Sequence, residues 1–167
     1  MMEKDAELRT EFNRILGREG LQYNGRTQVK HFFSVLHEDM GLDHIRDNLK
    51  KVFSKLQLTI LQGCHLIRPR EVTGFDDPFN PTIARELLNI LGITCLDWSG
   101  ELECCGASLA GINDKLSGAL LHEKIDGSNQ MGADGMMVSC SYCFLQLDER
   151  QQGSFPILLY PQLLGLC

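Results

Sequence analysis

Three short apolar runs, each followed by a cysteine-bearing segment, are the feature that most restricts how this chain can fold. The runs cover residues 56–62, 93–98 and 136–139. Each has the length of a β-strand, and stretches of helical periodicity separate them. Alternating strands and helices are typical of a mainly parallel sheet joined by right-handed crossovers. We therefore expect an α/β domain in which the cysteine segments share one edge of the sheet.

The periodicity of this region predicts about four strands flanked by helices. Strands are expected at residues 56–62, 93–98, 136–139 and 155–160. Helices are expected at residues 81–91, 112–125 and 142–151. At the first of these helices, Asn80 can cap the N-terminus, Pro81 suits the first turn and Gly92 follows the end.

Residues 1–55 contain no cysteine and show helical periodicity without strands. Three apolar stripes recur there at helical spacing: Leu8, Phe12, Ile15 and Leu16; Val29, Phe32, Phe33, Leu36 and Met40; and Ile45, Leu49, Val52 and Phe53. We expect them to be core-facing sides of helices, with contact to a partner helix as the alternative. The chain is thus expected to comprise a helical lead-in over 1–55 and an α/β domain over 56–167.

Composition and charge exclude several classes of protein. Sixteen Lys and Arg against 22 Asp and Glu give a net charge of −6, whereas a nucleic-acid binder normally relies on clustered basic charge. No apolar run approaches the roughly 20 residues that span a bilayer. The charged start, Met1 to Asp5, is expected to open a helical stretch and lacks the apolar core of a signal peptide. We therefore expect a cytoplasmic protein that binds no nucleic acid and has no membrane span.

The one unusual feature of the composition is its seven cysteines. Because the sequence shows no secretory signal, metal ligands or catalytic thiols are a better interpretation of them than disulfides. Five of them follow the expected strands: Cys64, Cys104, Cys105, Cys140 and Cys143. Because the carboxyl ends of parallel strands meet at one edge, we expect these five thiols to converge. Gly63 and Gly106 beside them would let the backbone come close to a bulky group.

The number and spacing of the five thiols favour a polynuclear iron–sulfur cluster over zinc. Zinc prefers four ligands, often from two short-spaced pairs, whereas only Cys140 and Cys143 form such a pair here. Neighbouring side chains of an extended segment point opposite ways, so Cys104 and Cys105 suit two metal ions better than one. A cubane cluster takes four cysteines and would leave the fifth without a role. Zinc stays the alternative.

The order Cys64, Cys104-Cys105-Gly106, Cys140-x-x-Cys143 resembles the CCG motif of heterodisulfide reductase B subunits. The resemblance extends to residues 63–69, 76–78 and 161–165 and covers nearly the whole chain. Full subunits of that family carry two CCG modules, and this sequence is similar to the C-terminal one. We therefore expect either a fragment or a separate protein that meets its other half in trans.

The resemblance implies that the five cysteines hold a non-cubane four-iron cluster (4Fe-4S) and carry the catalysis. It implies an oxidoreductase that reduces a disulfide, such as that of coenzyme M and coenzyme B, with single electrons. The partners implied are a second CCG module, in cis or trans, and electron-donor subunits carrying flavin or iron–sulfur clusters. Self-association into a homo-oligomer is a further possibility. Related modules occur in thiol-dependent fumarate reductases, glycolate oxidases and lactate-utilisation proteins, so the substrate stays open.

Residues beside the cysteines each admit two interpretations. His65 could donate a hydrogen bond to a cluster sulfur or bond only to local backbone. Arg68 and Arg70 could attract an anionic thiol substrate or simply pair with Asp76 and Asp77.

Two functions of other classes also stay open. One is a zinc-thiolate module that mediates subunit assembly without catalysis. The other is a thiol-redox sensor in which Cys140 and Cys143 form a disulfide without metal. The remaining cysteines are expected to stand apart, because Cys95 lies within a strand, where a cysteine is usually a small buried residue, and Cys167 is the last residue.

Overall fold

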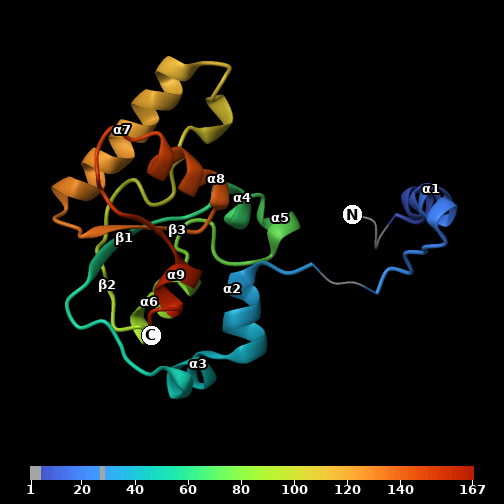
Figure 1. Ribbon diagram of the computed structural model, residues 1–167, viewed down its shortest axis with the longest axis horizontal. Helices are drawn as coiled ribbons and strands as arrows, with labels where there is room; N and C mark the ends of the chain where they lie inside the picture. Colours follow the sequence, from blue (N-terminus) through green and yellow to red (C-terminus); the bar gives the residue numbers. More distant parts are fainter. Residues whose placement is uncertain (1–4, 27–28) are drawn as a thin grey trace. The chain divides into compact units, whose positions relative to one another are not determined.

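The computed structural model describes residues 5–26 and 29–167 (Figure 1). The chain divides into two compact units, Met1–His31 and Phe32–Cys167. The helical start expected at Met1 to Lys4 lies outside the described residues. Within the described ranges, no helix combines the length and apolar character that crossing a membrane requires.

The first unit is built on one helix, α1 (Ala6–Leu16), followed by the 3-10 turn η1 (Gly17–Glu19). Asp5 caps α1 by accepting a hydrogen bond from the backbone N–H of Leu8 at 3.0 Å. No residue of α1 is buried, and Phe12 and Ile15 are 42% and 49% exposed. Within this unit the first apolar stripe therefore faces no core, because its described residues comprise one helix and a turn that enclose no interior.

The second unit contains a four-stranded parallel sheet, as the sequence predicts. Its strands are β1 (Gln57–Leu61), β2 (Thr94–Cys95), β3 (Gly135–Val138) and β4 (Ile157–Leu159), in the order β2-β1-β3-β4. Leu61 pairs with Val138, so Gln62 and Ser139, which follow these strands, are neighbours at the carboxyl edge. The expected α/β fold with a parallel sheet is confirmed.

Helices and helical turns make up most of the rest of this unit. They are α2 (Phe32–Ser34), the π-helical η2 (Val35–Met40), α3 (Leu42–Asn48), α4 (Cys64–Ile67), α5 (Arg70–Thr73), α6 (Ile83–Ile90), the 3-10 turn η3 (Ala107–Leu109), α7 (Asp114–Gln130), α8 (Ser141–Phe144), the π-helical η4 (Leu145–Glu149) and α9 (Tyr160–Leu164). The helix expected over 142–151 is thus a short α-helix that continues as a π-helix.

The side chains of β1 alternate between two cores, one on each face of the sheet. Leu58 and Ile60 belong to a core that includes Leu87 of α6. Leu61 belongs to a second core that includes Leu121 of α7. Figure 1 shows α7 on one side of the sheet and α6 and α9 on the other.

The lead-in helices from residue 32 onward share the first of these cores. Phe33, Leu36 and Ile45 are buried together with Leu58 and Ile60, as their stripes predict. Other members of the second stripe are exposed: Val29, Phe32 and Met40. The division of the chain at residue 55 stays a prediction.

The third apolar stripe does not form one helix, because α3 already ends at Asn48. Leu49 is extended, and the backbone N–H groups of Lys50 and Lys51 donate to the carbonyl of Cys167 at 2.8 and 3.0 Å. The N–H of Phe53 donates to the carbonyl of Leu91 at 2.8 Å. Contacts distant in sequence therefore replace the helical hydrogen bonds over 49–53, and the prediction of a continuous helix there is wrong.

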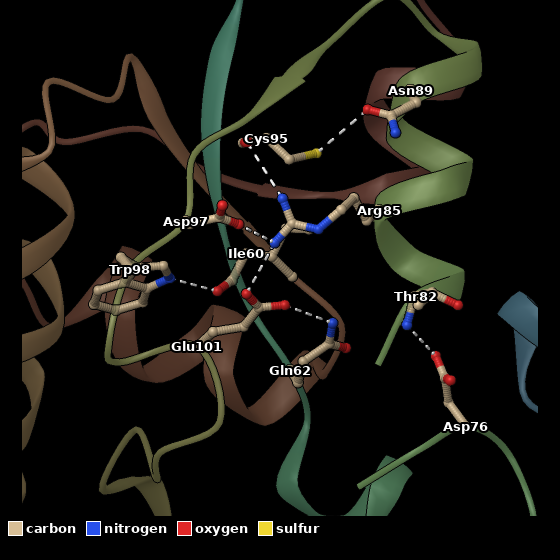
Figure 2. A network of polar contacts seen from close by, with 10 residues as sticks. All are labelled: Ile60, Gln62, Asp76, Thr82, Arg85, Asn89, Cys95, Asp97, Trp98 and Glu101. Carbon is tan, nitrogen blue, oxygen red and sulfur yellow. Dashed lines mark hydrogen bonds and ion pairs between the residues drawn. The ribbon is translucent and has the colours of Figure 1, made fainter. Parts of the chain in front are cut away.

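The N-terminus of α6 is capped by a residue other than the one expected. One carboxylate oxygen of Asp76 accepts from the backbone N–H of Thr82 at 2.9 Å (Figure 2). The same oxygen accepts from the backbone N–H of Ile83, also at 2.9 Å. Asn80 is not the cap, because α6 begins only at Ile83 and Thr82 occupies the N-cap position. Gly92 follows the helix end with a φ of +77°, as the sequence predicts.

Candidate metal centre

The structure brings five of the cysteines together at the carboxyl edge of the sheet. Two segments carry them on short helices: Cys64 opens α4 directly after β1, and Cys143 lies in α8 with Cys140 as its N-cap, directly after β3. Cys104 and Cys105 lie in the CCG loop (residues 103–106), just before η3. The expected convergence of the three segments is therefore observed, while the role of these cysteines as ligands stays a prediction.

Close approach of three thiols joins the last two segments. The Cys143 thiol lies within hydrogen-bonding reach of the sulfurs of Cys105 and Cys140 and can donate its one proton to either of them. Loss of that proton would remove this interaction and add negative charge beside the other two sulfurs, so the pKa of Cys143 is raised far above the ordinary value. Cys143 and Cys105 are also members of the core beneath α7.

Cys140 is far more acidic than an ordinary thiol. The hydrogen bond from Cys143 lowers the pKa of Cys140 to about 5, helped by the backbone N–H groups of Cys143 and Tyr142, while burial opposes the shift. The same kind of bond from Cys143, with help from the N–H of Ala107, lowers the pKa of Cys105 to about 7. At neutral pH Cys140 is therefore a thiolate, which is the form that binds metal ions.

Cys64 responds to the negative charge around it. Burial raises the pKa of Cys64, and charge on Cys104, Cys105 and Cys140 raises it further, while the N–H of His65 acts in the opposite direction. Thiols this close repel one another once they are all deprotonated. A cation bound among them would remove that repulsion.

Two glycines allow the cysteine segments to approach one another closely. A Cβ on Gly63 would lie 3.1 Å from the Cβ of Cys140. Gly106 has a φ of +82°, and a Cβ there would lie 3.0 Å from both the Leu120 Cβ and the Ser117 carbonyl. The sequence predicts that these glycines bring backbone close to a bound group; in the structure they bring backbone close to other protein segments.

Hydrogen bonds that are not part of the sheet hold the segment between β2 and the CCG loop against the end of β1. The strand expected over 93–98 pairs only at Thr94 and Cys95. Beyond it, the Trp98 indole N–H donates to the carbonyl of Ile60 at 2.8 Å (Figure 2). The backbone N–H of Gln62 donates to the carbonyl of Glu101 at 2.9 Å.

Arg85 of α6 fixes the same segment from the side, as Figure 2 shows. Its guanidinium lies 2.9 Å from the carboxylate of Asp97 and 3.2 Å from that of Glu101. The side-chain amide of Gln62 donates to the other carboxylate oxygen of Glu101, also at 3.2 Å. Burial raises the pKa of Glu101, and its hydrogen bonds and the nearby Arg85 charge oppose that rise. This network joins the residue before Gly63 to the segment leading into the CCG loop, and the sequence patterns did not predict it.

The two candidate arginines have different partners. Arg70 pairs with Asp77 at 3.7 Å in an exposed position, as one interpretation expects. In the part of the chain that the structure describes, Arg68 pairs with no aspartate. Its guanidinium donates to the carbonyls of Pro78 at 3.0 Å and Leu102 at 3.4 Å. The attraction of an anionic substrate by Arg68 therefore stays a prediction.

His65 is exposed and adjoins Cys64 on α4. It lies close enough to Cys140 for a positive imidazolium to help lower the pKa of that thiol. A hydrogen bond from His65 to a bound cluster stays a prediction.

The other two cysteines lie apart from the five, as expected. Cys95 is in β2, its sulfur is 3.9 Å from the Asn89 side-chain oxygen, and burial raises its pKa to about 11. The Cys167 thiol donates to the carbonyl of Leu163. All seven cysteines are free thiols. In residues 5–26 and 29–167, no three Cys, His, Asp or Glu side chains are arranged to hold a metal ion as they stand.

The donor chemistry of the centre fits an iron–sulfur cluster. Thiolates are the soft ligands that such clusters take, and backbone N–H groups directed at the sulfurs tune them. The Gly106 N–H, for example, lies 3.4 Å from the Cys104 sulfur. At the ends of β1 and β3, the Gln62 side-chain oxygen and the Ser139 hydroxyl are buried without a hydrogen-bond partner among the described residues. Gln62 and Ser139 directly precede the segments that carry Cys64 and Cys140, so both orphaned atoms border the candidate site.

A family model described as CCG, cysteine-rich domain, matches residues 58–148. The chain belongs to this family. The matched region contains the five clustered cysteines and excludes Cys167.

Curated relatives extend the similarity over nearly the whole chain. A protein of Archaeoglobus profundus, named as like the B subunit of heterodisulfide reductase, is 31% identical over 98% of this chain and 59% of that protein. The B subunit of ferredoxin:CoB-CoM heterodisulfide reductase from Methanosarcina mazei is 28% identical, over 99% and 58%. The 8-methylmenaquinol:fumarate reductase membrane anchor subunit of Wolinella succinogenes is 25% identical, over 98% and 60%. The resemblance to heterodisulfide reductase B subunits is thus confirmed, and the chain spans about three fifths of the length of these relatives.

A solved structure also shares the fold. The crystal structure of a hypothetical protein from Helicobacter pylori superposes with a TM-score of 0.64 at 12% identity, over 99% of this chain and 30% of that one. At that identity the likeness concerns the fold alone.

Proposed function

We propose that this chain is an iron–sulfur redox module of a heterodisulfide-reductase-like oxidoreductase. Its ligands would be Cys64, Cys104, Cys105, Cys140 and Cys143, and its cofactor a non-cubane [4Fe–4S] cluster. The observation that supports this most strongly is the meeting of five thiols from three distant segments, with the Cys143 thiol within hydrogen-bonding reach of both Cys105 and Cys140.

The chain's own residues would prepare the site for the cluster. Cys140 and Cys105, with pKa values of about 5 and 7, are the thiols most ready to bind as thiolates. Cys143 would release the proton that it shares with them, so cluster binding is coupled to proton release. The N–H groups of Tyr142 and Ala107 already donate to sulfur and would keep stabilising negative charge there. When bound, the cluster would supply single electrons to a disulfide.

The relatives support a proposal for the substrate and the partners. Two relatives carry the CoB-CoM heterodisulfide in their names, so the disulfide of coenzyme M and coenzyme B is the substrate we propose. Because the chain spans about three fifths of their length, a second CCG module in cis or in trans would complete the active unit. Electron-donor subunits with flavin or iron–sulfur clusters would supply the electrons, in the cytoplasm. We expect no turnover of a heterodisulfide by this chain alone.

Anaerobic purification followed by iron, sulfide and zinc analysis tests the proposal. The wild-type chain should be brown with nearly equal iron and sulfide, and Cys64→Ser should lose most of both. Cys95→Ser and Cys167→Ser are matched controls that should keep their iron. A colourless protein with one zinc would support the assembly module instead, and a metal-free protein with a Cys140–Cys143 disulfide would support the sensor. Equal iron loss in Cys95→Ser would show that the ligand set is wrong.

A further inference from the structure

Helix α7 joins two of the cysteine segments through a chain of buried hydrogen bonds. The Ser117 hydroxyl donates to the carbonyl of Gly106 at 3.0 Å. The side-chain amide of Gln146 in turn donates to the Ser117 hydroxyl at 2.9 Å and contacts the Ser117 carbonyl at 3.3 Å. Ser117 and Gln146 are 1% and 3% exposed, so water does not compete for these bonds.

The two ends of this series of hydrogen bonds lie beside cysteines that come from different segments. Gly106 directly follows Cys105 in the CCG loop, and Gln146 lies three residues after Cys143, in the π-helix η4. The approach of Gly106 to α7 is close enough that only glycine fits, since a Cβ would be 3.0 Å from the Ser117 carbonyl. The position of one loop on α7 is therefore tied to that of the other through Ser117.

We propose that Ser117 and Gln146 are positioning residues for the cysteine centre. The hydrogen bonds that link Gly106, Ser117 and Gln146 set the separation of the Cys105 and Cys143 sulfurs. Among the described residues, no backbone hydrogen bond joins the two segments that carry these cysteines. This inference rests on the proposed function, because a cluster held by both loops requires that separation to be fixed. Supporting hydrogen bonds of this kind commonly decide how tightly a metal group is held.

A metal-free measurement tests the positioning directly. The test uses the full chain with only Cys105 and Cys143 kept. Ser replaces the other five cysteines: Cys64, Cys95, Cys104, Cys140 and Cys167. Equilibration with mixtures of reduced and oxidised glutathione then gives the effective molarity of this thiol pair. Ser117→Ala and Gln146→Met should each lower the effective molarity about tenfold, because the two loops then move independently.

Ser128→Ala is the matched control. Ser128 lies on the same helix, is 0% exposed and also makes a buried side-chain hydrogen bond, but its partner is Thr59 of β1. Its removal should lower the unfolding midpoint in urea while leaving the Cys105–Cys143 effective molarity unchanged. An equal loss in Ser128→Ala would overturn the proposal, because general destabilisation would then explain the effect.

A second measurement uses the anaerobically reconstituted protein with all seven cysteines. Ser117→Ala and Gln146→Met should lose iron to a chelator at least fivefold faster than wild type and show an altered electron paramagnetic resonance spectrum, whereas Ser128→Ala should not. Gln146→Met keeps the Ser117–Gly106 bond and serves where Ser117→Ala does not fold. If wild type takes up no iron, the proposed function fails while the effective molarities still decide the positioning. If Ser117→Ala and Gln146→Met match wild type in both measurements, the positioning proposal is overturned.

Discussion

Lys124 of α7 forms an ion pair with Glu103, the residue immediately before the adjacent cysteines, although the Lys124 side chain is only 1% exposed. The same ammonium lies 3.0 Å from the carboxylate of Glu123. Burial by itself lowers the pKa of Lys124, but its hydrogen bonds to the two carboxylates raise that pKa above the ordinary value. Helix α7 therefore holds the CCG loop at both ends, through Glu103 on one side and Gly106 on the other.

Glu103→Gln should loosen the CCG loop, and Glu123→Gln should not. Both carboxylates contact Lys124 and are similarly exposed, at 51% and 58%, so the two variants form a matched pair. Each should cost about 0.5–1 kcal/mol of unfolding free energy, as for a half-exposed ion pair. Hydrogen exchange at the Gly106 amide should speed up in Glu103→Gln alone. Equal rates in the two variants would show that the ion pair does not anchor the loop.

The Glu103–Lys124 contact should also weaken in acid. Its hydrogen bond with Lys124 lowers the pKa of Glu103 below the ordinary value of 4.5. A carboxyl whose folded-state pKa is depressed stabilises the fold above the unfolded pKa, and that contribution is lost as the pH falls through the folded one. The stability difference between wild type and Glu103→Gln, measured by urea unfolding, should therefore shrink below about pH 4.5.

Substitution by alanine should change the unfolding free energy in opposite directions at two glycines of α7. A Cβ on Gly118 meets nothing within 4 Å, so Gly118→Ala should raise the unfolding free energy by about 1 kcal/mol through helix propensity. A Cβ on Gly127 would lie 3.2 Å from the ring of Trp98, which its hydrogen bond to Ile60 holds in place. Gly127→Ala should therefore lower the unfolding free energy by about 1 kcal/mol.

Fluorescence gives an independent readout of that pair, because Trp98 is the single tryptophan of the chain. The emission spectrum should shift in Gly127→Ala and stay as in wild type in Gly118→Ala. Stabilisation by both substitutions would mean that the indole ring moves aside at no cost.

Cys95 should make the protein less stable at alkaline pH. Burial raises the pKa of Cys95 from 9.0 to about 11, so the folded state disfavours its thiolate. An acid whose folded-state pKa is raised contributes stability that is lost as the pH rises between the two values. Urea unfolding of wild type and Cys95→Ala should show their stability difference falling from pH 9 to pH 11. A constant difference over that range would contradict the assigned shift.

The sheet and the meeting of the cysteines could be predicted because both depend on local patterns. Continuous apolar runs mark β1, β3 and β4, and a parallel arrangement sends the residues after each strand to one edge. The length of β2 could not be predicted in this way. Its continuation is held by Trp98 and Glu101, whose hydrogen bonds to Ile60 and Gln62 depend on contacts distant in sequence.

The sequence patterns did not predict the polar residues that hold the cysteine segments, because the buried side of a helix is expected to be apolar and these residues are not. The buried residues of α7 are Ser117, Leu121, Lys124 and Ser128. They recur every three or four positions and so share one side of the helix, but three of the four are polar. Helical spacing around Leu121 was the signal that could have found them. Their burial is possible only because Gly106, Glu103 and Thr59 supply partners from other elements.

Removal of the Arg85 guanidinium should leave the Glu101 carboxylate without a counter-charge and with the Gln62 amide as its side-chain partner, although the Glu101 side chain is only 14% exposed. Arg85→Met should cost about 2–3 kcal/mol of unfolding free energy, less than for a fully buried pair. Asp97→Asn is the control: Asp97 touches the same guanidinium but is 91% exposed, so its loss should cost under about 0.5 kcal/mol.

The same network gives Arg85→Met a pH dependence of defined sign. Burial already raises the pKa of Glu101, and loss of the Arg85 charge should raise it further. Because the folded-state pKa then lies above the unfolded one, Arg85→Met should lose stability as the pH rises above about 4.5. Adding Glu101→Gln should recover part of the lost stability and abolish this slope, as urea unfolding at several pH values would show. A pH-independent cost in Arg85→Met would mean that the guanidinium acts through its bond to the Cys95 carbonyl, at 3.3 Å, and not through Glu101.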